Sequence, residues 1–148
     1  MRSIFLIITL FSVALLLMLS ASCTTQGPAD QEFPIGSLEN PLILDDYSEI
    51  DSQITYEGTI GIEKLYIKVI NIPYLNNNHT VELYADGDLD LYTYSDAFVT
   101  LQDSSTSSSG PVFFASCTAT TTSTGELYIM LDGTKTTSVT NFMLTAGT

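Results

Sequence analysis

The chain has little positive charge, little sulfur and few of the side chains that usually carry catalysis. Its 148 residues include no Trp, 1 His and 2 Cys, with 4 Lys or Arg against 17 Asp or Glu. The formal net charge of −13 excludes nucleic acid as an electrostatic partner, because phosphate binding requires clustered Lys and Arg side chains. A structural zinc site would lack ligands, since such sites need four nitrogen or sulfur donors. With 45% hydrophobic residues, the composition is typical of a globular domain and not of a disordered chain.

The N-terminal segment has the layout of a secretory signal. A positive start containing Arg2 precedes an apolar run over residues 4–19, and the small residues Ser20-Ala21-Ser22 follow, just before Cys23. The apolar run is shorter than the roughly 20 residues that cross a bilayer as a helix. Residues 1–22 are therefore predicted to be a cleaved signal peptide, with an uncleaved membrane anchor as the alternative.

A Cys directly after a small-residue triplet resembles the lipobox of bacterial lipoproteins. In that family the peptidase cuts before the Cys, whose sulfur carries a diacylglycerol. Ser20 stands where the family usually has Leu, and Leu19 lies one position further back. The resemblance implies that Cys23 is acylated with palmitate-type chains and anchors the protein in the cell envelope, at the outer membrane or cell surface. Ordinary signal peptidase could also accept Ser20 and Ser22, which would give a secreted protein without a lipid.

Residues 23–50 are predicted to form a flexible tether that carries the acylated Cys. Most of them are polar, small or Pro, so the segment cannot bury enough apolar surface to offset the entropy of ordering it. The exception is Pro41-Leu42-Ile43-Leu44, which is expected to form a short edge strand or a clasp onto the following domain.

Residues 51–148 have the pattern of β-strands and no convincing helical period. Residues 64–70, 81–85 and 126–131 are rich in branched and aromatic side chains, and the first two alternate between apolar and polar residues. Gly, Asn, Asp and Ser clusters separate such runs. The expected fold class is all-β, an antiparallel β-sandwich or barrel with one core.

Four segments of this region resemble the bacterial pre-peptidase C-terminal domain. They are Tyr66-Ile67-Lys68-Val69, the central stretch from Thr80 to Tyr94, Gly125 to Leu131, and Asn141-Phe142-Met143-Leu144-Thr145. The central stretch contains Asp88-Leu89-Asp90-Leu91-Tyr92 and is the most specific match, whereas Phe142 stands in place of the closing Tyr. The resemblance implies a non-catalytic β-sandwich of the jelly-roll type, usually appended to secreted peptidases, with calcium-dependent collagen-binding modules among its relatives.

Asp86, Asp88 and Asp90 form the one cluster with plausible metal chemistry. Alternate residues of an extended strand share a face, so these carboxylates could offer oxygen ligands to Ca²⁺, with Asp96 and Asp103 joining from a loop. The cluster is not an EF-hand, because the sixth position counted from Asp86 is not Gly. Alternatively, Asp86-Gly87-Asp88 is a hairpin turn and Asp90 caps the next strand.

Tyrosines suggest a second candidate site, a stacking platform for sugars. Tyr92 and Tyr94 are expected to share one strand face, with Tyr84 lying across from them. The absence of Trp weakens this interpretation, and cross-strand aromatic pairs more often stabilise a sheet.

The remaining reactive side chains predict no catalytic site. His79 lies in an Asn-rich turn and is expected to be solvated. If Cys23 is acylated, Cys117 is a lone thiol that is most safely buried as a small apolar residue; otherwise a Cys23–Cys117 disulfide would tie the start of the chain to the domain.

The sequence therefore predicts a non-catalytic, membrane-anchored lipoprotein whose sandwich is a binding or envelope-associated module. The expected partners are the membrane, through the N-terminal lipid, and an unidentified protein or glycan. Ca²⁺ is the only cofactor suggested. The alternatives are a secreted Ca²⁺-dependent matrix- or glycan-binding module, a structural envelope component without a ligand, and a small hydrolase that uses the acidic cluster as paired carboxylates.

Overall fold

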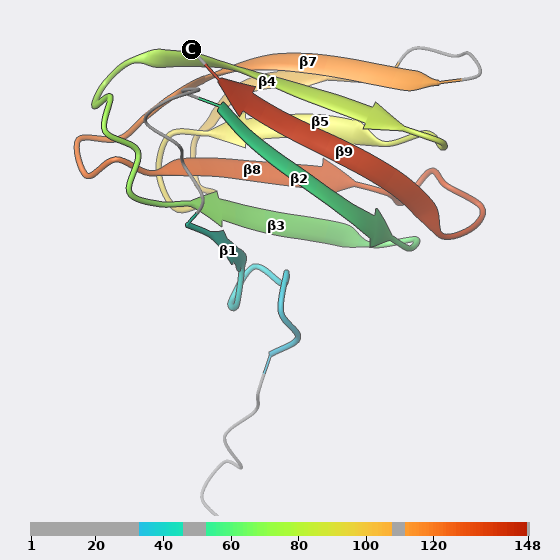
Figure 1. The fold of residues 1–148 in the computed structure, drawn as a ribbon. Coiled ribbons are helices and arrows are strands. Elements are labelled where there is room, and N and C mark those ends of the chain that lie inside the picture. The colour runs from blue at the N-terminus through green and yellow to red at the C-terminus, as the bar shows by residue number, and fades with distance from the viewer. Residues whose placement is uncertain (1–32, 46–52, 108–111, 148) are drawn as a thin grey trace, which may run out of the picture. The chain divides into compact units, whose positions relative to one another are not determined.

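A computed structural model describes residues 33–45, 53–107 and 112–147 (Figure 1). The signal segment, Cys23 and the first part of the expected tether lie outside the described residues. The described part contains nine strands and no helix, so it offers no helix that could cross a membrane. The strands are β1 (Leu42–Leu44), β2 (Gln53–Ile60), β3 (Lys64–Val69), β4 (Asn78–Ala85), β5 (Asp90–Tyr94), β6 (Leu101–Ser105), β7 (Phe113–Thr120), β8 (Leu127–Asp132) and β9 (Thr140–Gly147).

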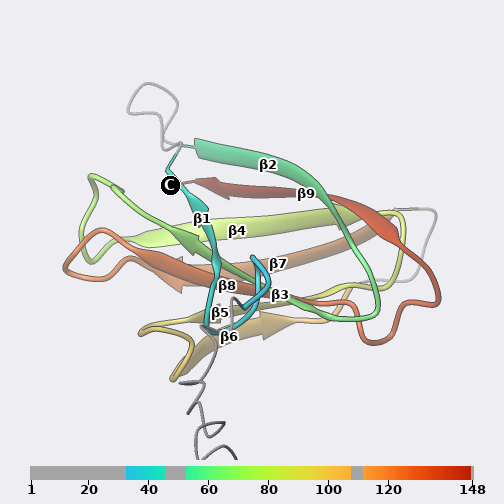
Figure 2. The same ribbon diagram turned by 90° about the horizontal axis from the view of Figure 1, so that it is seen from below.

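The strands form two sheets that enclose the core (Figures 1 and 2). One sheet has five strands in the order β1-β3-β8-β5-β6, and the other has four in the order β2-β9-β4-β7. From β2 to β9, every connection crosses from one sheet to the other except the one between β5 and β6. This is the topology of a jelly roll, so the predicted all-β sandwich of the jelly-roll type is confirmed.

The N-terminal strand β1 extends the sandwich beyond the expected domain boundary. It pairs in parallel with β3, with Leu42 opposite Ile67, and Leu42 and Leu44 pack against the core. The backbone N–H of Tyr66 also donates to the carbonyl of Gly36 at 2.8 Å. The predicted edge strand is thus confirmed, although it is parallel. The compact unit begins at Phe33, so part of the segment expected to be tether packs on the domain.

In one part of the core, the small inward side chains of β7 face large side chains of the other sheet. Strand β7 faces inward with Ala115, Cys117 and Ala119, all at most 2% exposed. The facing strands β5 and β8 contribute fully buried branched side chains such as Leu91 and Ile129. The Cys117 Sγ atom lies 3.4 Å from the Leu91 carbonyl oxygen, which shows how closely the backbones approach where β7 is small. Such complementary volumes allow close packing without voids.

Side chains of β6 cover the outer edge of β7. The backbone N–H groups of Ser116, Thr118 and Thr120 donate to side-chain oxygens of β6: Ser105 Oγ at 3.3 Å, Asp103 Oδ2 at 2.8 Å and Gln102 Oε1 at 3.0 Å, respectively. These bonds satisfy donors that an edge strand would otherwise present to another chain. The opposite edge of the same sheet is β2, which pairs only with β9 among the described strands.

Candidate binding surface

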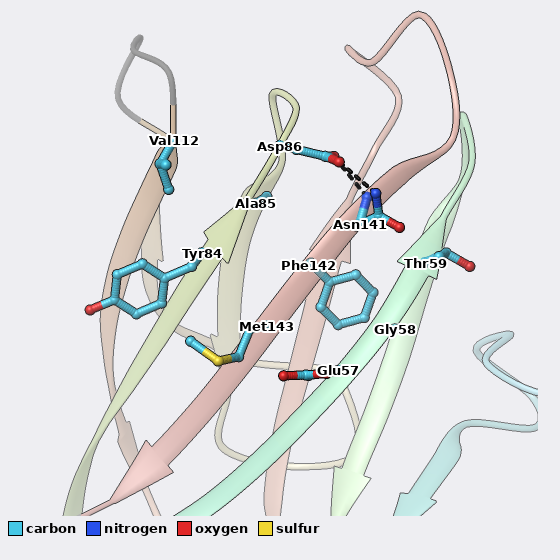
Figure 3. A pocket seen from close by; sticks show the side chains of 10 residues that line it. All are labelled: Glu57, Gly58, Thr59, Tyr84, Ala85, Asp86, Val112, Asn141, Phe142 and Met143. Atoms are coloured by element: carbon cyan, nitrogen blue, oxygen red, sulfur yellow. Dashed lines mark hydrogen bonds between the residues drawn. The ribbon is translucent and has the colours of Figure 1, made fainter.

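A shallow depression lies on the outer face of the four-stranded sheet (Figure 3). Its volume is about 550 Å³. The lining residues come from β2, β4 and β9 and from the ends of the adjoining loops: Glu57, Gly58, Thr59, Tyr84, Ala85, Asp86, Val112, Asn141, Phe142 and Met143. We call this depression, together with the ring of Phe114 that packs against Tyr84, the aromatic groove.

Strand pairing brings together residues that lie far apart in the sequence. Tyr84 of β4 stands opposite Phe114 of β7 on one side and opposite Met143 of β9 on the other, and Met143 stands opposite Glu57 of β2. Alternation places the neighbours of these residues, such as Leu83 and Leu144, in the core. A row of outward-facing side chains therefore crosses all four strands.

The rings of Tyr84 and Phe114 form one end of this row. Their centroids lie 4.9 Å apart with the planes tilted by 49°. Phe114 is 37% exposed and Val112, beside it, is 57% exposed. The Tyr84 hydroxyl donates to Glu82 Oε2 at 3.3 Å, and partial burial together with the Glu82 charge raises the pKa of this Tyr. An aromatic pair of this kind presents a rigid, amphipathic surface.

Asp86 stabilises the upper end of the groove. Its Oδ1 accepts the backbone N–H of Asn141 at 2.8 Å, and its Oδ2 accepts the Asn141 side-chain amide at 2.5 Å (Figure 3). The end of β4 is thereby fastened to the start of β9. The predicted calcium ligand Asp86 thus has both carboxylate oxygens occupied by one neighbour.

The structure does not bring the three predicted calcium ligands together. The turn after β4 carries the chain from one sheet to the other, so it is not a hairpin, and Asp90 opens β5 in the five-stranded sheet. Asp88 Oδ1 accepts from Ser107 Oγ at 2.8 Å, and Asp90, only 2% exposed, pairs with Lys135 Nζ at 2.6 Å. Across residues 33–45, 53–107 and 112–147, no three His, Cys, Asp or Glu side chains could hold one metal ion. Calcium binding stays a prediction to which this arrangement gives no support.

The two acids expected to join from loops have structural partners as well. Asp96 Oδ1 accepts the backbone N–H of Thr100 at 2.9 Å, and this bond lowers the pKa of Asp96. Asp103 lies on β6 and accepts from Thr118 and from the N–H of Ser104. These two carboxylates therefore accept hydrogen bonds from Thr100, Ser104 and Thr118.

The three tyrosines of the predicted stacking platform, Tyr84, Tyr92 and Tyr94, divide between the outer faces of the two sheets. Tyr92 and Tyr94 share the outer face of the five-stranded sheet, as predicted, but Tyr84 lies on the other sheet, so the expectation that it lies across from them is wrong. Phe98, from the β5–β6 loop, packs edge-on against Tyr66, Tyr94 and Tyr128 at centroid distances of 5.1, 6.0 and 5.2 Å. The rings of Tyr66, Tyr94 and Tyr128 therefore all contact Phe98, which favours sheet stabilisation over sugar stacking at Tyr94.

His79, a candidate base, and Cys117, a candidate nucleophile, both face the core. His79 is on β4, opposite Ala119, and only 1% exposed, so the expectation of a solvated turn residue is wrong. Burial lowers the His79 pKa, and a hydrogen bond with the Tyr74 backbone acts in the opposite direction. The prediction of a buried Cys117 is confirmed, and burial, helped by the Asp103 charge, raises the pKa of this thiol to about 12. Whether Cys23 can reach it lies outside the described residues.

Sequence patterns alone did not reveal most of the groove. The alternation in residues 113–120 could have indicated a strand with Phe114 outward, but Glu57 and Met143 carry no motif. They belong to the groove only because β9 lies between β2 and β4.

Comparisons with known proteins give no family for this chain. No protein-family model and no curated protein matches it. A solved structure from Aeromonas hydrophila, that of PliG, described as a periplasmic lysozyme inhibitor of g-type lysozyme, aligns with a TM-score of 0.48 at 7% identity. The alignment covers 72% of this chain and 94% of that one.

Proposed function

We propose that this chain is a non-catalytic binding module of the bacterial cell envelope, anchored through an acylated Cys23, that captures a protein partner in the aromatic groove. The observation that carries the proposal is the row formed by Phe114, Tyr84, Met143 and Glu57 on an open sheet face. Aromatic residues and Met are enriched in protein interfaces, and Tyr in particular often dominates the binding energy.

Exposed apolar groups beside the rings support a binding surface. Val112 is 57% exposed and Phe114 is 37% exposed. The neighbours of Phe114 along the chain, Phe113 and Ala115, pack inward against the core. Burying such side chains against a partner is favourable, at roughly 25 cal/mol for each Å² of apolar surface removed from water. A protein partner offers the flat, extended contact that a shallow groove requires.

The distribution of reactive groups supports a role without catalysis. Two carboxylates line the aromatic groove, Glu57 and Asp86, and both oxygens of Asp86 are bonded to Asn141; no His, Cys, Ser or Lys of the described residues lines it. His79, the single His of the chain, is directed into the core, as is Cys117 with its raised pKa. A general base must lie within hydrogen-bond reach of the proton it removes, which neither residue does for a molecule in the groove.

Lipid anchoring rests on the resemblance of residues 20–23 to a lipobox. Residues 24–32 can span at most about 35 Å between an anchored Cys23 and Phe33, so the sandwich would stay close to the membrane. Metabolic labelling with a fatty-acid analogue tests this part of the proposal: the Cys23→Ala variant should lose the label. Persistence of the label in that variant would show that Cys23 is not the site of acylation.

Photo-crosslinking in the native host tests the groove. We suggest placing p-benzoylphenylalanine at Phe114 in the full chain, with the same probe at Leu101 as a control, because Leu101 is 51% exposed but lies on β6 of the other sheet. The probe at Phe114 should give a discrete protein adduct that the probe at Leu101 does not give. The absence of an adduct at Phe114, or the same adduct at both positions, would overturn the groove as the binding surface.

A further inference from the structure

Charge is divided unevenly between the two sheets. The four strands β2, β4, β7 and β9 contain no Lys or Arg, and the acids Glu57 and Glu82 are on their outer face. Each lysine of the described residues is in an ion pair: Lys64 and Lys68 of β3 pair with Asp132 at 3.5 Å and Glu126 at 2.7 Å, and Lys135 of the β8–β9 connection pairs with Asp90 at 2.6 Å. The outer-face acids Glu57 and Glu82 thus form no ion pair with any lysine of the described residues.

The acids of this face lie where they can act on a molecule in the groove. Glu57 lines the groove, is exposed, and forms no hydrogen bond or ion pair with any other described residue through its side chain. Glu82 is two residues from Tyr84 on the same strand face, and its Oε2 accepts the Tyr84 hydroxyl at 3.3 Å. Both carboxylate oxygens of Asp86, at the end of the groove, accept hydrogen bonds from the neutral Asn141.

We propose that the partner is a protein with a basic surface that places a Lys or Arg side chain in the aromatic groove. This inference rests on the proposed function and specifies the partner's chemistry. The cationic head would lie over the rings of Tyr84 and Phe114, which attract cations through their π faces. The methylene stem would contact Met143 and Val112, and Glu57 and Glu82 would supply the opposite charge. The net charge of −13 would also speed the encounter with a basic partner.

The same observations disfavour other occupants of the groove. A second copy of this chain, docked face to face through this sheet, would bring acids against acids with no Lys or Arg to pair with them. An anionic lipid surface would be repelled for the same reason. A neutral ligand would make no use of Glu57 and Glu82, and this difference can be measured.

Two charge-matched double variants separate a local site from the overall charge of the chain. The groove variant is Glu57→Gln with Glu82→Gln, which preserves shape and the acceptor for Tyr84. The control variant is Glu39→Gln with Glu63→Gln, two exposed acids that do not line the groove. Both variants change the net charge equally. The probe is a fluorescent oligo-arginine peptide, titrated into the full-length protein in detergent at low salt and followed by anisotropy.

The groove variant should bind the peptide roughly 5-fold more weakly, whereas the control variant should change the affinity by less than about 2-fold. Phe114→Leu, which keeps an apolar side chain but removes the ring, should weaken binding by roughly 3-fold. Equal weakening in both double variants, or no binding of the peptide at low salt, would overturn the basic partner. A photo-crosslinked adduct at Phe114 that is unaffected by Glu57→Gln and Glu82→Gln would also overturn it, while leaving the binding module itself intact.

Discussion

The single His of the chain predicts a specific dependence of stability on pH. His79 is buried at 1% exposure on the inner face of β4, where the charged imidazolium is disfavoured, and its pKa lies below the ordinary value of 6.5. The hydrogen bond with the Tyr74 backbone offsets this shift only in part. In the unfolded chain the same side chain is solvated and titrates near its ordinary pKa.

The sign and size of the effect follow from linkage. Below pH 6.5 the unfolded chain binds a proton at His79 that the folded chain does not bind, so the free energy of unfolding falls as the pH is lowered. One proton sets a ceiling of about 1.4 kcal/mol per pH unit. The contribution of His79 is fully present above pH 6.5 and is lost as the pH falls below that value, with a slope no steeper than this ceiling. No other side chain has an ordinary pKa between about 5 and 8, so this window isolates His79.

Urea unfolding near pH 7.5, 6.5 and 5.5 measures the slope. The His79→Gln variant should unfold with a midpoint that changes little over this range, whatever its absolute stability. Thr80→Ala, on the exposed side of the same strand, should keep the slope of the parent protein. A flat profile in the parent protein, or an unchanged slope in His79→Gln, would refute the assignment to His79.

Three further outcomes test the packing around the core. Cys117 should resist a thiol reagent near pH 8 in the folded protein and react once urea unfolds it, because burial raises its pKa to about 12; rapid labelling of the folded state would contradict this. Phe98→Ala should lower the free energy of unfolding by about 1–3 kcal/mol in denaturant titrations through loss of three aromatic contacts, whereas Val99→Ala, at a side chain 76% exposed, should have little effect. Asp103→Ala should cost about 1–3 kcal/mol because the Thr118 N–H loses its acceptor, and Asp103→Asn should cost less; equal stability of both variants and the parent in thermal melts would argue against the bond.

Local patterns were sufficient for the fold class and for several individual residues. The apolar and polar alternation of Val81 to Ala85 predicted a strand with one buried face, and that strand is the second half of β4. The apolar side chains of Pro41-Leu42-Ile43-Leu44 indicate a short edge strand or a clasp inside an otherwise polar segment, and β1 is an edge strand. A lone Cys117 is expected to be buried, and it lies in the core. In each case the decisive force is burial of apolar surface, which depends on the residue and its near neighbours.

The candidate site was beyond such patterns. A period of two says which side chains share a face of a strand, but not which sheet the strand joins or which strands flank it. For this reason Asp86, Asp88 and Asp90 resembled one ligand set, although a crossing between the sheets sends them to three different partners. For the same reason the pattern places Tyr84 together with Tyr92.

The sequence by itself determined that a charge-poor, strand-rich chain with few basic residues becomes an acidic β-sandwich. The tertiary structure decided that the Tyr84–Phe114 pair and the acids Glu57 and Glu82 lie on one face. The jelly roll inserts β9 between β2 and β4, and this arrangement depends on the pairing of strands that are distant in the chain.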